Sequence, residues 1–311
     1  MGTVVQDRDT LSNHRDESPK MSLEASVIIP TYQEWDILQK CLDCLAQQSV
    51  AADRFEVIIA NNNASAEVPA SLNLPQNARV IHVPKPGSYA ARNAAIHHAR
   101  GQTLFFTDSD CLPDRKWIET GLSSLARLGP TDRVGGAIDL FPKGETWTGP
   151  ELYDLVHHML QPVYVRWGWC ATANLVTSRA TFDLVGPFDE DSFSGGDWKW
   201  GGRATELGSV IVFSQEASIR HPARDSFAVL AKKRRRVVGQ IHDIEVATGK
   251  KEHATFSFLL PNFSELASTA NDGRLTEAEK MTVFWIQYRL TLVAFLETFR
   301  LRYLGGKPNR S

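Results

Sequence analysis

The sequence predicts an α/β fold in which helices cover an open, mostly parallel sheet. Three short apolar runs, at residues 25–30, 55–60 and 103–106, each lead into a polar loop. Strands that are apolar along their whole length are typical of parallel sheets buried on both faces. Segments with helical periodicity separate the runs, and this alternation indicates the α/β class. With 311 residues and 42% hydrophobic composition, the chain is long enough to bury a large core.

The first half is expected to form a Rossmann-like unit. Its predicted strands are residues 25–30, 55–60, 80–83 and a last strand that ends on Asp108, and its predicted helices are residues 36–48 and 89–99. A turn at residues 84–87 introduces the second helix, with Ser88 as its expected N-cap, and Gly101 ends it.

The second half is predicted with fewer regular elements. We expect helices at residues 117–128, 179–185 and 203–207, and strands at residues 134–141 and 210–213. Residues 193–200 are predicted to be a loop, and residues 218–222 lead away from the last strand. The aromatic stretch between Trp147 and Trp169 has neither helical nor strand periodicity, and it suits sugar stacking as well as core packing.

Composition and motifs exclude several functional classes. With 36 acidic and 34 basic residues the net charge is −2, which does not indicate a nucleic-acid partner. The four cysteines suggest reduced thiols, and the Cys41–Cys44 pair is interpreted as part of a core helix, with a redox or zinc role as the alternative. Neither GxGxxG nor GxxxxGK followed by Ser or Thr occurs, which argues against a dinucleotide dehydrogenase and a P-loop NTPase.

The stretch with the most chemical information is the apolar strand that ends on Asp108-Ser109-Asp110. A buried parallel strand delivers such residues to the carboxyl edge of the sheet, where ligands bind in open α/β folds. Two neighbouring carboxylates repel each other, and a hard divalent cation would stabilise their proximity. The alternative is an Asp-rich turn without a ligand.

Six segments in order resemble a known family. They read ASVIIPTYQE, FEVIIANNNAS, GSYAARNAAIHHARG, LFFTDSDC, CATANLVTSRATFDLVGPFDE and SGGDWKWGGR. Together they resemble the family 2 inverting glycosyltransferases, which have the GT-A fold, over residues 24–225. The resemblance implies a GT-A domain at 24–225, with a nucleotide-sugar half at 24–115 and an acceptor half at 116–225.

The resemblance also implies a donor site that uses Mn²⁺ or Mg²⁺. It assigns direct metal coordination to Asp110, and a ribose or water-mediated metal contact to Asp108. His221 is expected to add a metal or diphosphate contact, with a surface histidine as the alternative. Nucleotide contacts are expected from Pro30, Thr31, Tyr32, Glu34, Asn61, Arg92, Asp108 and Ser109. Asn61 stands where relatives usually carry an aspartate, and Arg92 is expected to reach the diphosphate unless it is a surface arginine.

Inversion requires one general base for the acceptor hydroxyl. In the family this base belongs to a Glu-Asp pair, and here the pair reads Gly196-Asp197, so Asp197 is the candidate. A helix N-cap is the competing interpretation of Asp197. Asp189 and Asp191 are the alternative bases.

The predicted activity is metal-dependent, inverting transfer of a single sugar from a UDP-, GDP- or dTDP-linked donor to a glycan or lipid-linked acceptor in polysaccharide or glycoconjugate biosynthesis. The Gln-x-x-Arg-Trp motif of processive members is absent, and residues 234–240 read RRRVVGQ instead. The alternatives are a catalytically silent sugar- or nucleotide-binding protein and a sugar nucleotidyltransferase.

The two ends of the chain differ from its centre. Residues 1–23 are polar and are predicted to be a disordered leader, and residues 226–311 a helical C-terminal extension. The basic run 232–236 is expected at a solvated helix end, able to bind diphosphate or anionic lipid, and residues 281–304 form a packed or an interfacial helix. We therefore expect a cytoplasmic protein with peripheral contact at the inner face of a membrane through these basic and amphipathic segments.

Overall fold

The computed structural model describes residues 23–249 and 262–308. The predicted leader therefore lies outside the described residues, except for its last position. The described part confirms an α/β fold with a mostly parallel central sheet, helices on both faces and a helical C-terminal segment.

The sheet has eight strands in the order β3-β2-β1-β4-β7-β6-β8-β5. Strands β1 to β4 are mutually parallel neighbours, and β6 is parallel to β8, whereas β7 and β5 run antiparallel to their neighbours. The strands are β1 Ala25–Thr31, β2 Phe55–Asn61, β3 Ala78–His82, β4 Thr103–Phe106, β5 Leu112–Pro113, β6 Arg133–Phe141, β7 Leu175–Ser178 and β8 Ile211–Pro222.

Two hydrophobic cores lie on opposite faces of this sheet because successive strand residues point to opposite sides. Val27 and Ile29 of β1 face α1 and α3, whereas Ile28 faces α2, α6 and α7. The covering helices are α1 Trp35–Ala46, α2 Ser88–His98, α3 Trp117–Leu125, α6 Arg179–Val185 and α7 Gly196–Glu206. Cys41 is buried on α1 and Cys44 is partly buried, which agrees with a core helix.

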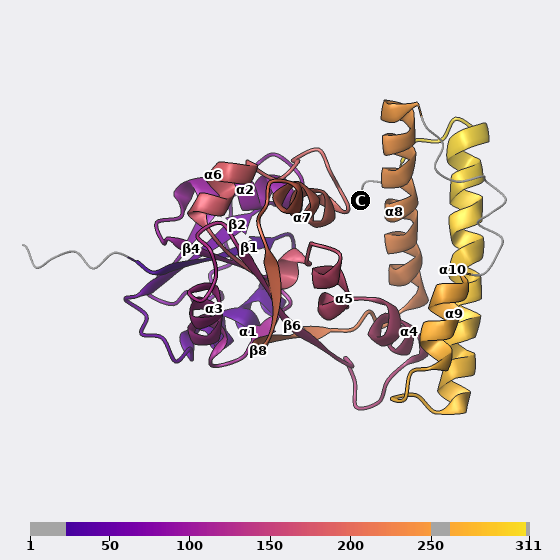
Figure 1. Ribbon diagram of the computed structural model, residues 1–311, viewed down its shortest axis with the longest axis horizontal. Helices are drawn as coiled ribbons and strands as arrows, with labels where there is room; N and C mark the ends of the chain where they lie inside the picture. Colours follow the sequence, from indigo (N-terminus) through magenta and orange to yellow (C-terminus); the bar gives the residue numbers. More distant parts are fainter. Residues whose placement is uncertain (1–22, 250–261, 309–311) are drawn as a thin grey trace, which may run out of the picture.

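A third layer contains the C-terminal helices. Figure 1 shows α8 Phe227–Thr248 standing between the α/β body and α10 Glu277–Tyr303, with α9 Phe263–Ala270 and α4 Gly149–His157 at the base of the pair. Leu152 of α4, Leu230 of α8 and Leu290 of α10 belong to one core cluster. None of the helices in the described ranges is both long and apolar enough to cross a membrane.

Three local expectations were wrong. Gly87, not Ser88, is the N-cap of α2, because its φ of 125° turns the chain and its carbonyl accepts from the Ala91 amide at 3.0 Å. The stretch from Trp147 to Trp169, expected to be irregular, forms α4 and α5 Gln161–Arg166. The last strand continues to Pro222 across an irregularity opposite residues 136–138.

Candidate functional site

Acidic and histidine side chains gather where β4 and β8 end. Asp108, Asp110, Cys111 and His221 each offer a ligand atom, and these atoms all lie within 4.8 Å of one another. His221 stands in β8 opposite Leu140 of β6, and its Nε2 lies 3.6 Å from Asp110 Oδ1. The structure therefore brings the predicted Asp-x-Asp and His221 together, and His221 is buried rather than a surface residue.

The donor set suits a hard divalent cation. The Nδ1 atom of His221 is 2.7 Å from the Pro222 carbonyl, which can only accept, so Nδ1 donates there and Nε2, on the side of Asp110, is the ring nitrogen available to a cation. Burial raises the pKa of Cys111 well above its usual value, so this thiol stays protonated and is a poor ligand. Two carboxylates and one imidazole remain, a set that fits Mn²⁺ or Mg²⁺.

Burial also raises the pKa of Asp110, the charge of His221 opposes the rise and Asp108 adds to it. A third acid stands beside the pair, because Ser109 Oγ donates to Glu34 Oε2 at 2.8 Å. Burial raises the pKa of Glu34, the Ser109 bond opposes this, and Asp110 raises it further. A cation at this place would relieve the repulsion among the three carboxylates.

A groove of about 810 Å³ lies among the loops that follow β1 and β2. It is lined by the loop after β1, by the loop after β2 and by the turn before α2, with Tyr32, Trp35, Asn62, Asn63, Pro84 and Pro86 among its walls. Its volume is in the range of sites that hold a cofactor-sized ligand. Tyr32, 58% exposed, offers a free aromatic face for stacking.

Asparagines hold the two loops of the groove together. Asn61 is fully buried, and its Oδ1 accepts from the Asn63 amide at 3.0 Å and from Asn63 Nδ2 at 2.8 Å. Asn63 Oδ1 in turn accepts from the Gln33 amide at 2.9 Å, where Gln33 adopts a left-handed φ of 57°. Asn61 therefore shapes the loop, while Asn62 and Asn63, which the sequence did not single out, line the groove. Pro30 and Thr31 are buried at the end of β1 beneath it.

Arg92 is a buried link between the two halves of the site. Its guanidinium is 3% exposed, forms an ion pair with Asp108 and lies 5.7 Å from the ring centroid of Tyr89. Tyr89, one turn earlier on α2, donates to Asp197 Oδ1 at 3.2 Å and accepts from the Asp197 amide at 3.1 Å. A continuous set of contacts therefore joins Asp108 to Asp197 through α2.

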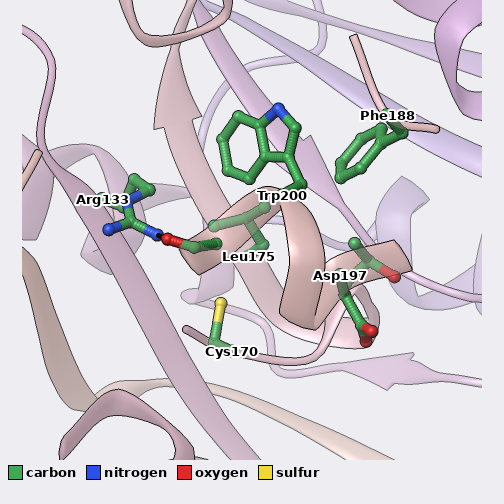
Figure 2. Close-up of a pocket in the computed structure, with 8 residues that line it drawn as sticks. Arg133, Cys170, Leu175, Phe188, Asp197 and Trp200 are labelled. Carbon is green, nitrogen blue, oxygen red and sulfur yellow. Dashed lines mark hydrogen bonds between the residues drawn. The ribbon is translucent and has the colours of Figure 1, made fainter. Parts of the chain in front are cut away.

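Asp197 lies in the first turn of α7 rather than in a loop, and Gly195, with a φ of 67°, is the N-cap. Figure 2 shows its carboxylate beside a small pocket lined by Cys170, Phe188 and Trp200. Burial raises the pKa of Asp197, whereas the Trp198 amide, Arg92 and Tyr89 oppose the rise. A carboxyl whose pKa is raised toward neutrality is suited to accept a proton.

The alternative acids are engaged elsewhere. Asp189 accepts from Ser192 at 2.7 Å and pairs with Lys199 at 3.2 Å, and these contacts lower its pKa. Asp191 is exposed and lies 3.4 Å from Lys85. Asp197 alone of the three adjoins the buried pocket.

The basic run lies inside α8 and not at a helix end, which corrects the sequence prediction. Lys232 and Arg235 are exposed, but Lys233 and Arg236 are partly buried and turn toward the site. Burial lowers the pKa of Lys233 well below its usual value and Arg224 lowers it further, while the carboxylates of Asp154 and Asp197 oppose this. Helical periodicity places Lys232 with Arg235 and Lys233 with Arg236, but the sequence does not show which pair is exposed until the inner face of α8 is known.

These cations have no anionic partner of their own within the described residues. Lys233 and Arg236 form no hydrogen bond or ion pair there, and the buried Nε of Arg236 is unsatisfied. Arg224, by contrast, is held by Asp154 at 2.7 Å. Buried cations without partners are costly, and an anionic ligand would offset that cost.

Comparison with known proteins identifies the family of this chain. The family model described as Glycosyl transferase family 2 matches residues 26–181, about half of the chain. A glycosyltransferase of Haloferax volcanii, AglE, is 35% identical over 224 residues, which cover 70% of this chain and 72% of AglE. The chain belongs to glycosyltransferase family 2. It is therefore a glycosyltransferase, as its motifs predicted.

Solved structures support the same fold. A mannosyltransferase of Pyrobaculum calidifontis, PcManGT, in complex with GDP-Man and Mn²⁺, aligns with a TM-score of 0.55 at 18% identity, over 90% of this chain and 88% of PcManGT. A fragment of Staphylococcus aureus TarS in complex with UDP-GlcNAc aligns with a TM-score of 0.51 at 16% identity, over 90% of this chain and 76% of the fragment. This family 2 glycosyltransferase therefore has the GT-A fold.

Proposed function

We propose that this glycosyltransferase transfers one sugar, with inversion, from a UDP-, GDP- or dTDP-linked donor to a hydroxyl of a glycan or lipid-linked acceptor. The observation that carries the proposal is the Asp108, Asp110 and His221 cluster together with its contacts on two sides. Ser109 bonds to Glu34 in the loop after β1 that lines the groove, and Arg92 links Asp108 to Tyr89, which bonds to Asp197. The groove offers space for the nucleoside, and the cluster would adjoin the diphosphate. PcManGT in complex with GDP-Man and Mn²⁺, and the TarS fragment in complex with UDP-GlcNAc, share the fold and agree with a nucleotide-sugar donor.

In this mechanism Asp197 removes the proton from the acceptor hydroxyl while its oxygen attacks the anomeric carbon. The bond from that carbon to the donor phosphate oxygen breaks, and the nucleoside diphosphate leaves with the electron pair. Tyr89 holds the Asp197 carboxylate through its hydroxyl. Lys233 and Arg236 face the same space and would bind phosphate oxygens.

Asp110, Asp108 and His221 Nε2 would hold Mn²⁺ or Mg²⁺, while Glu34 accepts from Ser109 and so orders the loop between the two aspartates. When bound, the cation would neutralise charge that develops on the departing diphosphate. Arg92 pairs with Asp108, so in this structure it positions that carboxylate rather than reaching outward. A diphosphate contact of Arg92 would require this pair to open.

A catalytically silent nucleotide-binding protein is the second candidate, because Gly196 replaces the first acid of the family pair. We further propose that the reaction takes place in the cytoplasm at a membrane surface, where a lipid-linked acceptor would be available. The buried, unpaired cysteines Cys41, Cys111 and Cys170 agree with a reducing compartment.

Release of nucleoside diphosphate from UDP-, GDP- and dTDP-sugars, together with thermal shift, would test the proposal. We expect one donor class to raise the melting temperature only with Mn²⁺. Asp110→Ala should lose this shift, whereas Asp197→Asn should keep the shift and lose at least about 100-fold in turnover. Asp191→Asn is the matched control and should retain both.

Two results would contradict these assignments. Turnover by Asp197→Asn equal to that of the original chain would exclude Asp197 as the base. A donor-induced shift without turnover in the original chain, with every acceptor class offered, would support the silent binding protein instead.

A further inference from the structure

The helix α10 has two apolar faces. One face packs against α8 and α4 through buried positions that include Val283, Leu290 and Leu301. The opposite face carries exposed large apolar side chains at intervals of three, four, seven or eight residues, namely Met281, Trp285, Tyr288, Leu296, Phe299 and Tyr303. These six residues define the outer stripe of α10. Figure 1 shows α10 at the outer edge of the molecule, on the far side of α8 from the sheet.

The outer stripe is unusual for a surface helix, which normally presents polar residues to water. Met281 is 66% exposed, Trp285 59% and Leu296 64%. From Met281 to Tyr303 the stripe extends for about 33 Å at the rise of an α-helix. A continuous apolar surface of this length indicates an interaction site rather than isolated exposed residues.

Charge changes along α10, because its exposed acid Glu277 stands one turn before Met281, at the amino-terminal end of the outer stripe. Beyond Glu279, the remaining acid of α10 is Glu297, which is 5% exposed and pairs with Arg300 at 2.6 Å. Arg289 and, just past the helix, Lys307 are exposed cations. The outer surface from residue 280 to residue 308 is therefore apolar and cationic, without an exposed acid.

This charge pattern separates two occupants. Arg289 stands beside the stripe with its guanidinium 3.8 Å from the ring centroid of Phe227. If a second copy covered the stripe between residues 280 and 308, Arg289 and Lys307 would meet no exposed acid from that part of the helix. An anionic lipid surface supplies both an apolar layer and negative headgroups, and tryptophan and tyrosine are the side chains enriched at that boundary. The exposed apolar stripe, the aromatic rings and the cations thus match one partner.

We propose that the outer stripe of α10 binds an anionic membrane surface, with the helix lying in the plane of the interface. The inference goes beyond sugar transfer and does not depend on it. It also places the membrane contact on α10 rather than on the basic run of α8, because Lys233 and Arg236 of that run are partly buried. Binding at α10 would hold the enzyme beside lipid-linked molecules.

Co-sedimentation of the full chain with vesicles tests this. We expect binding to vesicles of phosphatidylglycerol and phosphatidylcholine, weaker binding to phosphatidylcholine alone, and weakening by salt. The double variant Trp285→Gln/Leu296→Gln should bind at least about tenfold less, because two apolar anchors are lost. Both sites are exposed, so circular dichroism and the melting temperature should stay unchanged.

The matched control is Leu207→Gln/Val210→Gln, which removes two equally exposed apolar side chains between α7 and β8. This control should bind vesicles like the original chain. Equal loss in both double variants, or no vesicle binding by the original chain, would overturn the proposal. So would a concentration-dependent dimer in analytical ultracentrifugation that Trp285→Gln/Leu296→Gln abolishes, because the stripe would then be a dimer interface.

Failure here can be distinguished from failure of the proposed function. Release of nucleoside diphosphate from a soluble donor is measured without vesicles, and Trp285→Gln/Leu296→Gln should leave it unchanged. Vesicle binding by a chain that turns over no donor would keep the α10 proposal and overturn the transfer mechanism.

Discussion

At the residue scale, Tyr89 accounts for the absence of the first acid from the Glu-Asp pair. A Cβ at Gly196 would lie 2.5 Å from the Tyr89 ring, so the ring occupies the space that a side chain at 196 would need. The same tyrosine makes two hydrogen bonds to Asp197. We infer that in this chain the ring of Tyr89 occupies the place of an acid at position 196, and that its hydroxyl orients Asp197.

Removal of the Tyr89 hydroxyl tests this role. In Tyr89→Phe, Asp197 loses a hydrogen bond that favours its charged form, so its pKa should rise. The base must be deprotonated to act, and the acid limb of the kcat profile should therefore move to higher pH. A lowered kcat with an unmoved limb would contradict the positioning role and indicate a purely structural one.

Lys233 is a partly buried cation whose charge would lower the stability of the free protein if the site binds an anion. Its pKa is depressed by burial, so in the free protein its positive charge is unfavourable. Lys233→Met should therefore raise the free energy of unfolding by about 1–3 kcal/mol, while turnover falls at least about tenfold. Chemical denaturation and donor turnover measure the two effects.

The exposed neighbour Lys232→Met is the control and should change neither quantity appreciably. Loss of stability in Lys233→Met would show that the ammonium group is well accommodated in the free protein. Unchanged turnover would remove Lys233 from the binding site.

At the element scale, Glu56 links β2 to β1, to β3 and to the segment after α2. Its carboxylate accepts from Ser26 at 2.7 Å and from the Arg100 amide and guanidinium, and it pairs with Arg79 of β3. Burial would raise the pKa of Glu56, but these hydrogen bonds together lower it below its usual value. The strand that leads to the 810 Å³ groove is therefore held by a charged group.

Glu56→Gln should cost about 1–3 kcal/mol of stability near neutral pH. Because the folded pKa lies below the unfolded one, this contribution is present above about pH 4.3 and is lost as pH falls through the folded pKa. The difference in unfolding free energy between the original chain and the variant should therefore shrink on acidification. Urea denaturation at pH 7 and below pH 4 checks this, and a constant difference would contradict it.

At the scale of the whole molecule, the C-terminal helices share a core with α4. Leu152, Tyr153 and Val156 of α4 are buried against α8 and α10. The boundary predicted at residue 226 stays a prediction, and a chain that ends at residue 225 tests it. We expect this shortened chain to expose the α4 side chains and to aggregate, or to melt at least about 5 °C lower in calorimetry. A soluble chain with the original melting temperature would show that the two parts fold independently.

The first half of the fold was predictable because its strands are mainly apolar and because helical segments separate most of them along the chain. The same local signal located the Asp-x-Asp at the sheet edge. The helices between Trp147 and Trp169 were not predictable from periodicity, since α5 has six residues, too few to show a repeating helical pattern. In α4, Leu152, Tyr153 and Val156 turn toward α8 and α10, which follow far later in the chain.

The sequence by itself located the Asp-x-Asp at the sheet edge, because a strand and the loop after it are adjacent in the chain. Only the tertiary structure decided what surrounds Asp197. Tyr89 meets Asp197 across 108 positions, and Lys233 faces Asp197 only because α8 packs with its inner face toward the site. Such contacts depend on how helices pack, and packing brings together residues that no local pattern relates.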